Sequence, residues 1–201
     1  MLRPNRTWQR IKKCHLAAVF TLVLAFCPVE KVAAASSKAS EGLQLYSQIH
    51  QVLVHPRCMN CHPRGDSPRQ GDEAYLHVPP VTRGSKDSGA AGLHCNACHQ
   101  AENYLPSGVP GAPTWHLPAR SMAWEGKSAG EICRQMLDPH RNGGKSRAQI
   151  VEHLTDDKLV AWGWDPGTDV RGKARTPVPI PKEEFDRIVK GWANSGAPCP
   201  N

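Results

Sequence analysis

Two pentapeptides of the same form carry the residues best suited to chemistry, Cys58-Met59-Asn60-Cys61-His62 and Cys95-Asn96-Ala97-Cys98-His99. The pattern CxxCH is the attachment signature of c-type haem. Two thiols three positions apart on one helical turn can both bond to the vinyl groups of a porphyrin, and the histidine that follows can reach the iron as its proximal axial ligand. The sequence therefore predicts two covalently bound haem c groups, with His62 and His99 as proximal ligands.

Other uses of these four thiols explain the pentapeptides less completely. Zinc ribbons also use paired cysteines, but they do not need a histidine directly after each pair. Their two pairs are also usually closer than the 33 residues that separate Cys61 from Cys95. Two structural disulfides would suit an exported chain, yet they leave both histidines without a role. Covalent haem is the favoured interpretation, with zinc and plain disulfides as the alternatives.

The sixth position of each iron decides between electron transfer and small-molecule chemistry. A distal ligand normally comes from a loop that folds across the porphyrin, and neighbouring prolines hold such a loop extended. His77 and His116 both lie in proline-rich loops, and we expect them over the first and the second haem, respectively. Met122 and His153 are reserve candidates, and His94 could reach only the haem of the other motif. The alternative is that these histidines are surface or propionate-binding residues.

Cys133 and Cys199 lie outside the two pentapeptides, and neither has a CxxC partner or a following histidine. A third haem is therefore not expected. In an oxidising compartment, two remaining cysteines normally pair. We expect a disulfide that ties the C-terminal tail to a helix in the middle of the chain.

The elements that must position these residues are short helices. Apolar residues recur at helical spacing over 40–53, and Ser128 and Glu131 form a capping-box pattern before another helix. Further helices are expected over 146–154, 157–162 and from Pro181 to Gly196, and a short one at the second pentapeptide. Segments 63–93 and 104–127 are expected to be loops rich in proline and glycine.

The 37-residue step from Cys58 to Cys95 is too short for two tandem haem domains, each of which would need on the order of 100 residues. We therefore expect one domain over 36–201 that holds both haems. The predicted fold class is mainly α, with short helices and long Pro/Gly-rich loops packed around two covalent haems and little or no sheet. Because the chain is so rich in proline and glycine, haem faces are expected to replace much of the side-chain core.

Residues 1–35 have the features of a secretory signal peptide. Five basic residues precede an apolar run at 16–26 that is too short to span a bilayer, and an Ala-x-Ala site ends at Ala35. We expect cleavage after Ala35 and export to the periplasm, with no permanent membrane span. Lipid attachment at Cys27 is the alternative, which the bulky Phe26 before it disfavours.

The positive charge of the chain belongs mostly to this segment. The whole chain carries a formal charge of +7 from 25 basic and 18 acidic residues. Residues 1–35 hold six of the basic residues and one of the acidic residues, which leaves 36–201 at +2. The sequence therefore gives no support to a nucleic-acid partner.

Several strings occur in an order that resembles small bacterial di-haem proteins labelled as a subunit of isoquinoline 1-oxidoreductase. They are His55-Pro-Arg-Cys-Met-Asn-Cys-His-Pro63, Gln70-Gly-Asp72, the second pentapeptide, Pro110-Gly-Ala-Pro-Thr-Trp-His-Leu117, Met122-Ala-Trp-Glu-Gly126 and Glu131-Ile-Cys133. The resemblance spans nearly all of 36–201. Isoquinoline oxidoreductases are similar to molybdenum hydroxylases, whose cofactors sit in other, larger subunits. What the resemblance implies is an electron-accepting partner of such an enzyme.

The expected function is therefore that of a periplasmic c-type cytochrome that transfers single electrons. The resemblance and the motifs imply redox partner proteins, a dehydrogenase or molybdenum hydroxylase as the donor and the respiratory chain as the acceptor. An electron carrier more than a catalyst is expected, so no residue is assigned a catalytic role. The alternative is a small haem enzyme, or a gas or peroxide sensor, in which one iron keeps an open coordination position.

Overall fold

The computed structural model describes residues 29–201, with side chains from Ser36 onward. Within this part the chain forms six α-helices, which are α1 (Val29–Leu53), α2 (Pro56–Met59), α3 (Ala129–Leu137), α4 (Arg147–Asp156), α5 (Lys158–Ala161) and α6 (Lys182–Asn194). It also forms two antiparallel pairs of two-residue strands, β1 (Arg69–Gln70) with β2 (Tyr75–Leu76) and β3 (Gly89–Ala90) with β4 (Leu93–His94). Three 3₁₀ turns are η1 (Cys95–Ala97), η2 (Arg120–Met122) and η3 (Trp162–Trp164). The expected mainly α class with little sheet is confirmed.

Local capping signals fix where the middle helices begin. The Ser128 hydroxyl accepts the Glu131 N–H, and the Glu131 carboxylate accepts the Ser128 N–H, so α3 starts with the predicted capping box. Ser146 and Gln149 form the same reciprocal pair at the start of α4. The Asp157 carboxylate caps α5 by accepting the Leu159 N–H.

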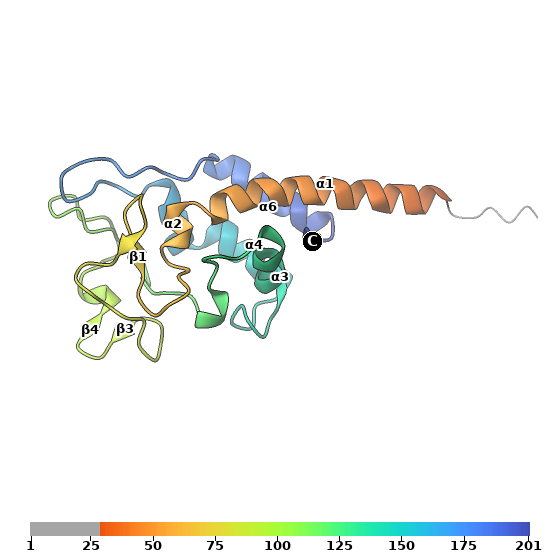
Figure 1. Cartoon of the computed structure of the whole chain (residues 1–201). Helices are drawn as coiled ribbons and strands as arrows, with labels where there is room; N and C mark the ends of the chain where they lie inside the picture. Colours follow the sequence, from red (N-terminus) through yellow and green to blue (C-terminus); the bar gives the residue numbers. More distant parts are fainter. Residues whose placement is uncertain (1–28) are drawn as a thin grey trace, which may run out of the picture.

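The helix expected over 40–53 is longer than predicted and begins at Val29. Residues 33–35 are alanines, and neither proline nor glycine interrupts the chain from Val29 to Glu41, so helix propensity is high throughout this stretch. Side chains 36–41 are exposed, and this part of α1 extends beyond the rest of the molecule (Figure 1). The predicted cleavage position after Ala35 falls within α1, and residues 1–28 of the predicted signal peptide lie outside the described residues.

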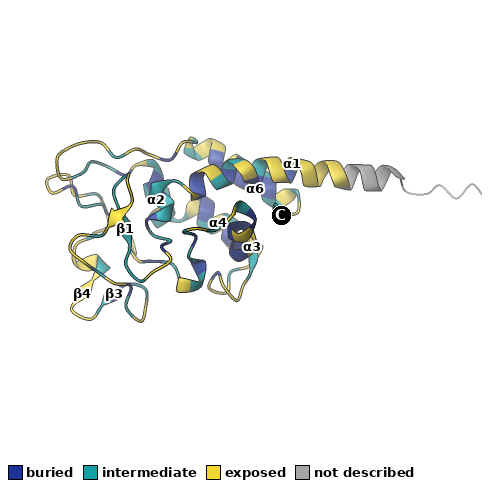
Figure 2. Cartoon of the chain, viewed as in Figure 1, coloured by how far each residue is buried: buried dark blue, intermediate teal, exposed yellow. Residues whose placement is uncertain are grey.

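Figure 2 shows that the buried residues are concentrated on the facing sides of the helices. Helix α1 packs on α6, and α4 packs on α6, α5 and α3. The core contains Tyr46, Ile49, Val52, Leu53, Met122, Trp124, Ile132, Cys133, Met136, Ile150, Leu154, Val178, Phe185, Ile188, Val189, Trp192 and Ala197. The predicted inner face of α6 is thus confirmed. This half of the molecule has a side-chain core of its own, which the proline and glycine content of the sequence led us to underestimate.

The other half is mostly loops, with the short strands β1–β4, and α2 lies at its border (Figure 1). The first CxxCH motif lies in α2 and the turn after it, and the second begins at η1. The strand pairs β1–β2 and β3–β4 are hairpins in the predicted loop 63–93, and the second extends one residue beyond it, to His94. Gly89 has a φ of +101°, and a Cβ there would lie 2.5 Å from the Leu93 carbonyl oxygen, so the second hairpin depends on a glycine at this position.

The expected disulfide is present. The sulfurs of Cys133 and Cys199 lie at bonding distance, 1.94 Å, and join α3 to the C-terminal tail. Within residues 29–201, none of the helices combines the length and the apolar character that crossing a membrane requires.

Candidate haem-binding site

Both CxxCH motifs fold as single helical turns, as their proposed chemistry requires. In the first motif, α2 begins at Pro56 and the turn continues through hydrogen bonds from Cys61 N–H to Cys58 O and from His62 N–H to Met59 O. In the second motif, η1 begins at Cys95, and the His99 N–H donates to the Cys95 carbonyl at 3.0 Å. The short helix expected here is a 3₁₀ turn.

The ring of His62 is held on two sides. Its Nδ1 lies 2.6 Å from the carbonyl oxygen of Met122, and the indole of Trp124 stacks on its face with ring centroids 3.4 Å apart and 9° between the planes. The backbone N–H of Trp124 also donates to the carbonyl of His62, at 2.9 Å. Orientation of the ring is therefore fixed by contacts from one short segment, η2 and the two residues after it.

The ring of His99 is held in the same way by different residues. Its Nδ1 lies 2.7 Å from the carbonyl oxygen of Pro110, and Trp115 stacks on it with centroids 4.4 Å apart and 5° between the planes. Trp115 in turn makes an edge contact with Trp162. The two motifs thus share a repeated arrangement in which a backbone carbonyl and a tryptophan from the 104–127 loop position the histidine.

These contacts define the state of both imidazoles. A carbonyl oxygen can only accept, so each Nδ1 must carry the proton and each Nε2 must carry a lone pair. Burial lowers the pKa of His62 to about 3 and also lowers the pKa of His99, so both rings are neutral near neutral pH. A neutral imidazole with Nδ1–H bonded to a carbonyl and Nε2 left as a donor is the usual form of a metal-ligating histidine.

The cysteines of the two motifs lie close together around a cavity of about 480 Å³. Cys61, Cys95 and Cys98 line this cavity, while Cys58 packs against the hydrophobic core. All four are free thiols. Burial, with a smaller contribution from the nearby Cys95, raises the pKa of Cys61 to about 11. The structure therefore contains no disulfide within either described motif, in contrast to the alternative of two structural disulfides.

The remaining wall of the cavity combines aromatic and basic side chains. Its residues include the aromatic Tyr75, Trp115 and Trp162. Five basic residues (Arg57, Arg69, Arg171, Lys173 and Arg175) outnumber three acidic ones (Asp72, Glu73 and Asp169). Apolar walls with a few charged groups are typical of cofactor sites, and the volume is within their usual range. A porphyrin presents flat apolar faces and two carboxylates, so the chemistry of this wall fits it.

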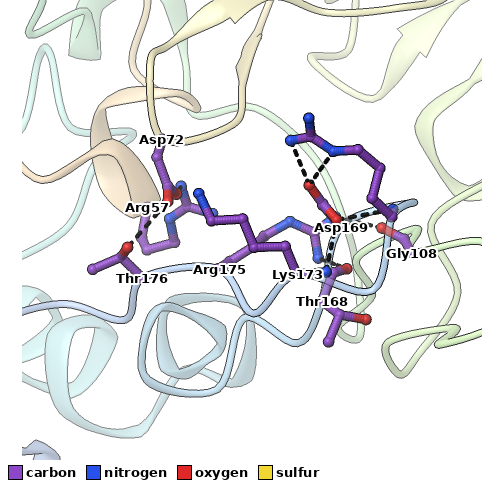
Figure 3. A network of polar contacts seen from close by, with 9 residues as sticks. Arg57, Asp72, Gly108, Thr168, Asp169, Lys173, Arg175 and Thr176 are labelled. Carbon is purple, nitrogen blue, oxygen red and sulfur yellow. Dashed lines mark hydrogen bonds and ion pairs between the residues drawn. The ribbon is translucent and has the colours of Figure 1, made fainter.

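Arg57 is the most buried of these cations, with a side chain 1 % exposed, and it forms an ion pair with Asp72. Figure 3 shows this pair beside Arg175, whose guanidinium donates to the backbone carbonyls of Gly108 and Thr168. The Nε of Arg57 is buried and has no hydrogen-bond acceptor among the described residues. A buried donor without a partner beside a cavity is what an anionic ligand group such as a propionate would satisfy.

Three of the histidines considered as distal ligands line the same cavity, but only His77 makes a ring contact with a motif histidine among the described residues. His77 and His116 both line the cavity, as does His94, and His77 lies beside His99 of the second motif, with ring centroids 5.9 Å apart. We expected His77 over the first haem, and the structure instead places it next to the second motif. The physical reason is that the hairpin β1–β2 turns the chain back, so that distance along the sequence does not give distance in space.

The two reserve candidates differ in their surroundings. The side chain of Met122 is buried in the hydrophobic core, and it is its backbone carbonyl that contacts His62. His153 is half-buried on α4, and its Nδ1 lies 3.0 Å from the Asp157 carboxylate. His153 is also one of the smaller electrostatic causes that lower the pKa of His62.

Sequence reasoning found the motif residues but not the groups that position them. Backbone acceptors such as the Met122 and Pro110 carbonyls have no sequence signal, because every residue carries a carbonyl. Trp115 and Trp124 could be recognised only as aromatic residues suited to stacking. No three His, Cys, Asp or Glu side chains within 29–201 converge as a metal-binding group; a haem iron takes four of its ligands from the porphyrin and needs only axial groups from the protein.

Comparisons with protein families, with curated proteins and with solved structures give no match to this chain. The functional assignment therefore depends on the residues and geometry of the site itself.

Proposed function

We propose that this protein is a di-haem c-type cytochrome that transfers single electrons. One observation carries the proposal: the histidine of each CxxCH motif has its Nδ1 bonded to a backbone carbonyl and its face covered by a tryptophan. Two unrelated structural histidines have no reason to share both contacts, whereas two proximal haem ligands do.

Each residue has a stated part in this proposal. The thiols of Cys58, Cys61, Cys95 and Cys98 would add across porphyrin vinyl groups and hold two haems by thioether bonds. The bound haem irons would supply the chemistry, a reversible one-electron change between ferric and ferrous. The protein holds His62 and His99 in the ligating tautomer, excludes water with Trp115 and Trp124, and places positive charge near the cavity.

Export to the periplasm belongs to the same proposal, because c-type haem is attached outside the cytoplasm. The Cys133–Cys199 disulfide supports an oxidising compartment. The electron donor would be a periplasmic dehydrogenase or molybdenum hydroxylase, and the acceptor a component of the respiratory chain. These partners rest on the sequence resemblance alone.

Haem content tests the proposal directly. Protein exported by a strain that matures c-type cytochromes should carry two haems per chain after acid–acetone extraction, measured by mass spectrometry and by the pyridine haemochrome spectrum. Cys58→Ala with Cys61→Ala should leave one haem, and so should Cys95→Ala with Cys98→Ala. Cys133→Ala with Cys199→Ala is the matched control and should retain both. Zinc without iron, or haem that extraction removes, would refute the proposal.

A carbon monoxide titration of the ferrous protein separates the carrier from the haem enzyme or sensor. A carrier with two six-coordinate irons should not bind carbon monoxide at neutral pH. Binding of one equivalent by the wild-type protein would instead favour an open coordination position, as a peroxidase or gas sensor requires.

A further inference from the structure

His77 and His99 form a pair across the cavity. Their ring centroids are 5.9 Å apart with 65° between the planes. His77 follows β2 in the first hairpin and His99 follows η1, so 22 residues of chain separate them. Both side chains line the cavity, which also contains the Cys95 and Cys98 thiols of the second motif.

The Nδ1 atom of His77, like that of His99, is hydrogen-bonded to a backbone carbonyl. The His77 Nδ1 lies 2.9 Å from the carbonyl oxygen of Pro79, which can only accept, so the proton resides on Nδ1 and Nε2 carries the lone pair. The backbone N–H of His77 donates to the Pro68 carbonyl, at 3.2 Å, and this anchors the loop. Within the described residues, the Nε2 of neither His77 nor His99 is paired.

The separation of the two rings matches what one iron between them would require. A metal–imidazole bond is about 2.0–2.1 Å, and the ring centre lies about 1.1 Å behind the nitrogen, so two in-line ligands have centroids about 6.3 Å apart. The observed 5.9 Å differs from this by a few tenths of an ångström. The observed arrangement is edge-on, so ligation of one iron by both rings would require a change in the His77 side-chain torsions.

We propose that His77 is the sixth ligand of the iron bound to His99, so that the second haem has bis-histidine ligation. This inference rests on the proposed function, since it concerns the haem at the second motif. Two other histidines line the cavity but fit less well. His94 directly precedes Cys95 and is exposed, and His116 is exposed and bonds through Nδ1 to the Thr114 carbonyl two residues earlier. Neither makes a ring contact with His99 among the described residues.

The test uses the full-length protein with both haems. His77→Ala should raise the carbon monoxide stoichiometry of the ferrous protein by one per chain and give one high-spin ferric signal in electron paramagnetic resonance. Added imidazole should restore the low-spin signal, which a general loosening of the fold would not allow. His77→Met should remain low-spin, with a higher reduction potential for that haem, because a thioether favours ferrous iron. His140→Ala, at an exposed histidine that does not line the cavity, is the matched control and should leave both irons unchanged.

A second set of variants identifies which haem responds. In the Cys58→Ala, Cys61→Ala protein, which keeps only the second haem, His77→Ala should still create the carbon monoxide site. In the Cys95→Ala, Cys98→Ala protein it should have no effect. The inference is overturned if both haems of the His77→Ala protein stay low-spin, or if the new site belongs to the first haem. Protein that carries no covalent haem in any variant would overturn the proposed function instead, so the two failures are distinguishable.

Discussion

Trp124 lies flat against His62, with ring centroids 3.4 Å apart, and its backbone N–H bonds to the carbonyl of the same histidine. Trp124 is 4 % exposed and belongs to the hydrophobic core. One residue therefore connects the proximal histidine of the first motif to the packed helices. Through Trp124 the stability of the core and the orientation of His62 become coupled.

Replacing Trp124 should affect the fold and one haem together. Truncation of a buried tryptophan typically costs about 3–5 kcal/mol, so Trp124→Ala should lower the free energy of unfolding by about that amount. Trp124→Phe keeps a ring on His62 and should cost less. In both variants the electron paramagnetic resonance signal of the first haem should broaden, because the His62 ring is less firmly oriented, while the second haem should not change.

Trp192→Phe is the control for this experiment. Trp192 of α6 is fully buried and packs on Tyr46 of α1, and it makes no ring contact with either motif histidine among the described residues. It should destabilise the protein without altering either haem signal. A change confined to the second haem in the Trp124 variants would contradict the assignment of Trp124 to His62.

The Cys133–Cys199 disulfide closes a chain segment with a sequence separation of 66 residues. The loop-entropy relation for a cross-link of this span gives about 4 kcal/mol of stabilisation, within the usual 2–5 kcal/mol for loss of a native disulfide. Cys199→Ser should lower the urea midpoint accordingly and leave the haem content at two. The wild-type protein should not react with a thiol reagent until it is reduced, and free Cys133 in the oxidised protein would contradict the pairing.

Asp157 links α4 to α5 and should make stability depend on pH in the acid range. Its carboxylate accepts from His153 and from the Leu159 N–H, and these bonds, the His153 bond foremost, lower its pKa to about 2. Because the folded-state pKa lies below the unfolded value of 3.8, the contribution is complete above about pH 4 and is lost as the pH falls toward 2. The side chain is 33 % exposed, so screening reduces it to on the order of 1 kcal/mol.

Asp157→Asn measures this contribution. Urea unfolding at pH 7 should show the variant to be less stable than the wild type, and the difference should narrow toward pH 2.5. His153→Gln removes the largest cause of the lowered Asp157 pKa. In that variant the pKa of Asp157 should lie closer to 3.8, so the free energy of unfolding should change less between pH 4 and pH 2 than in the wild type. A difference that stays constant from pH 7 to pH 2.5 would show that the Asp157 charge has no such role.

The helices could be predicted from the sequence because their signals are local. Ser128 with Glu131, and Asp157 before α5, cap helices through side chains within a few residues. The start of α1 could not be predicted, because the alanine-rich stretch at 33–35 favours a helix as well as a processing site. The contact between His77 and His99 could not be predicted either. It depends on how two short hairpins fold, and no periodic sequence pattern encodes such hairpins.

Arg57 should influence the reduction potential of a nearby haem through its charge. It directly precedes Cys58, lines the cavity, and is paired with Asp72, whose other carboxylate oxygen accepts from Thr176 (Figure 3). A positive charge favours ferrous iron over ferric. At an effective dielectric constant of about 20 and a separation of about 10 Å, one charge contributes about 1.7 kcal/mol, or some tens of millivolts.

Arg57→Gln should therefore lower the potential of one haem, and Asp72→Asn should raise it, because the latter leaves the Arg57 charge uncompensated. Redox titration followed at the haem absorption bands measures both shifts. The double variant removes both charges and should lie near the wild-type value, which tests whether the two shifts have an electrostatic origin. If Arg57→Gln and Asp72→Asn shift the potential in the same direction, the effect comes from loosening of the cavity wall, and the charge of Arg57 is not what tunes the haem.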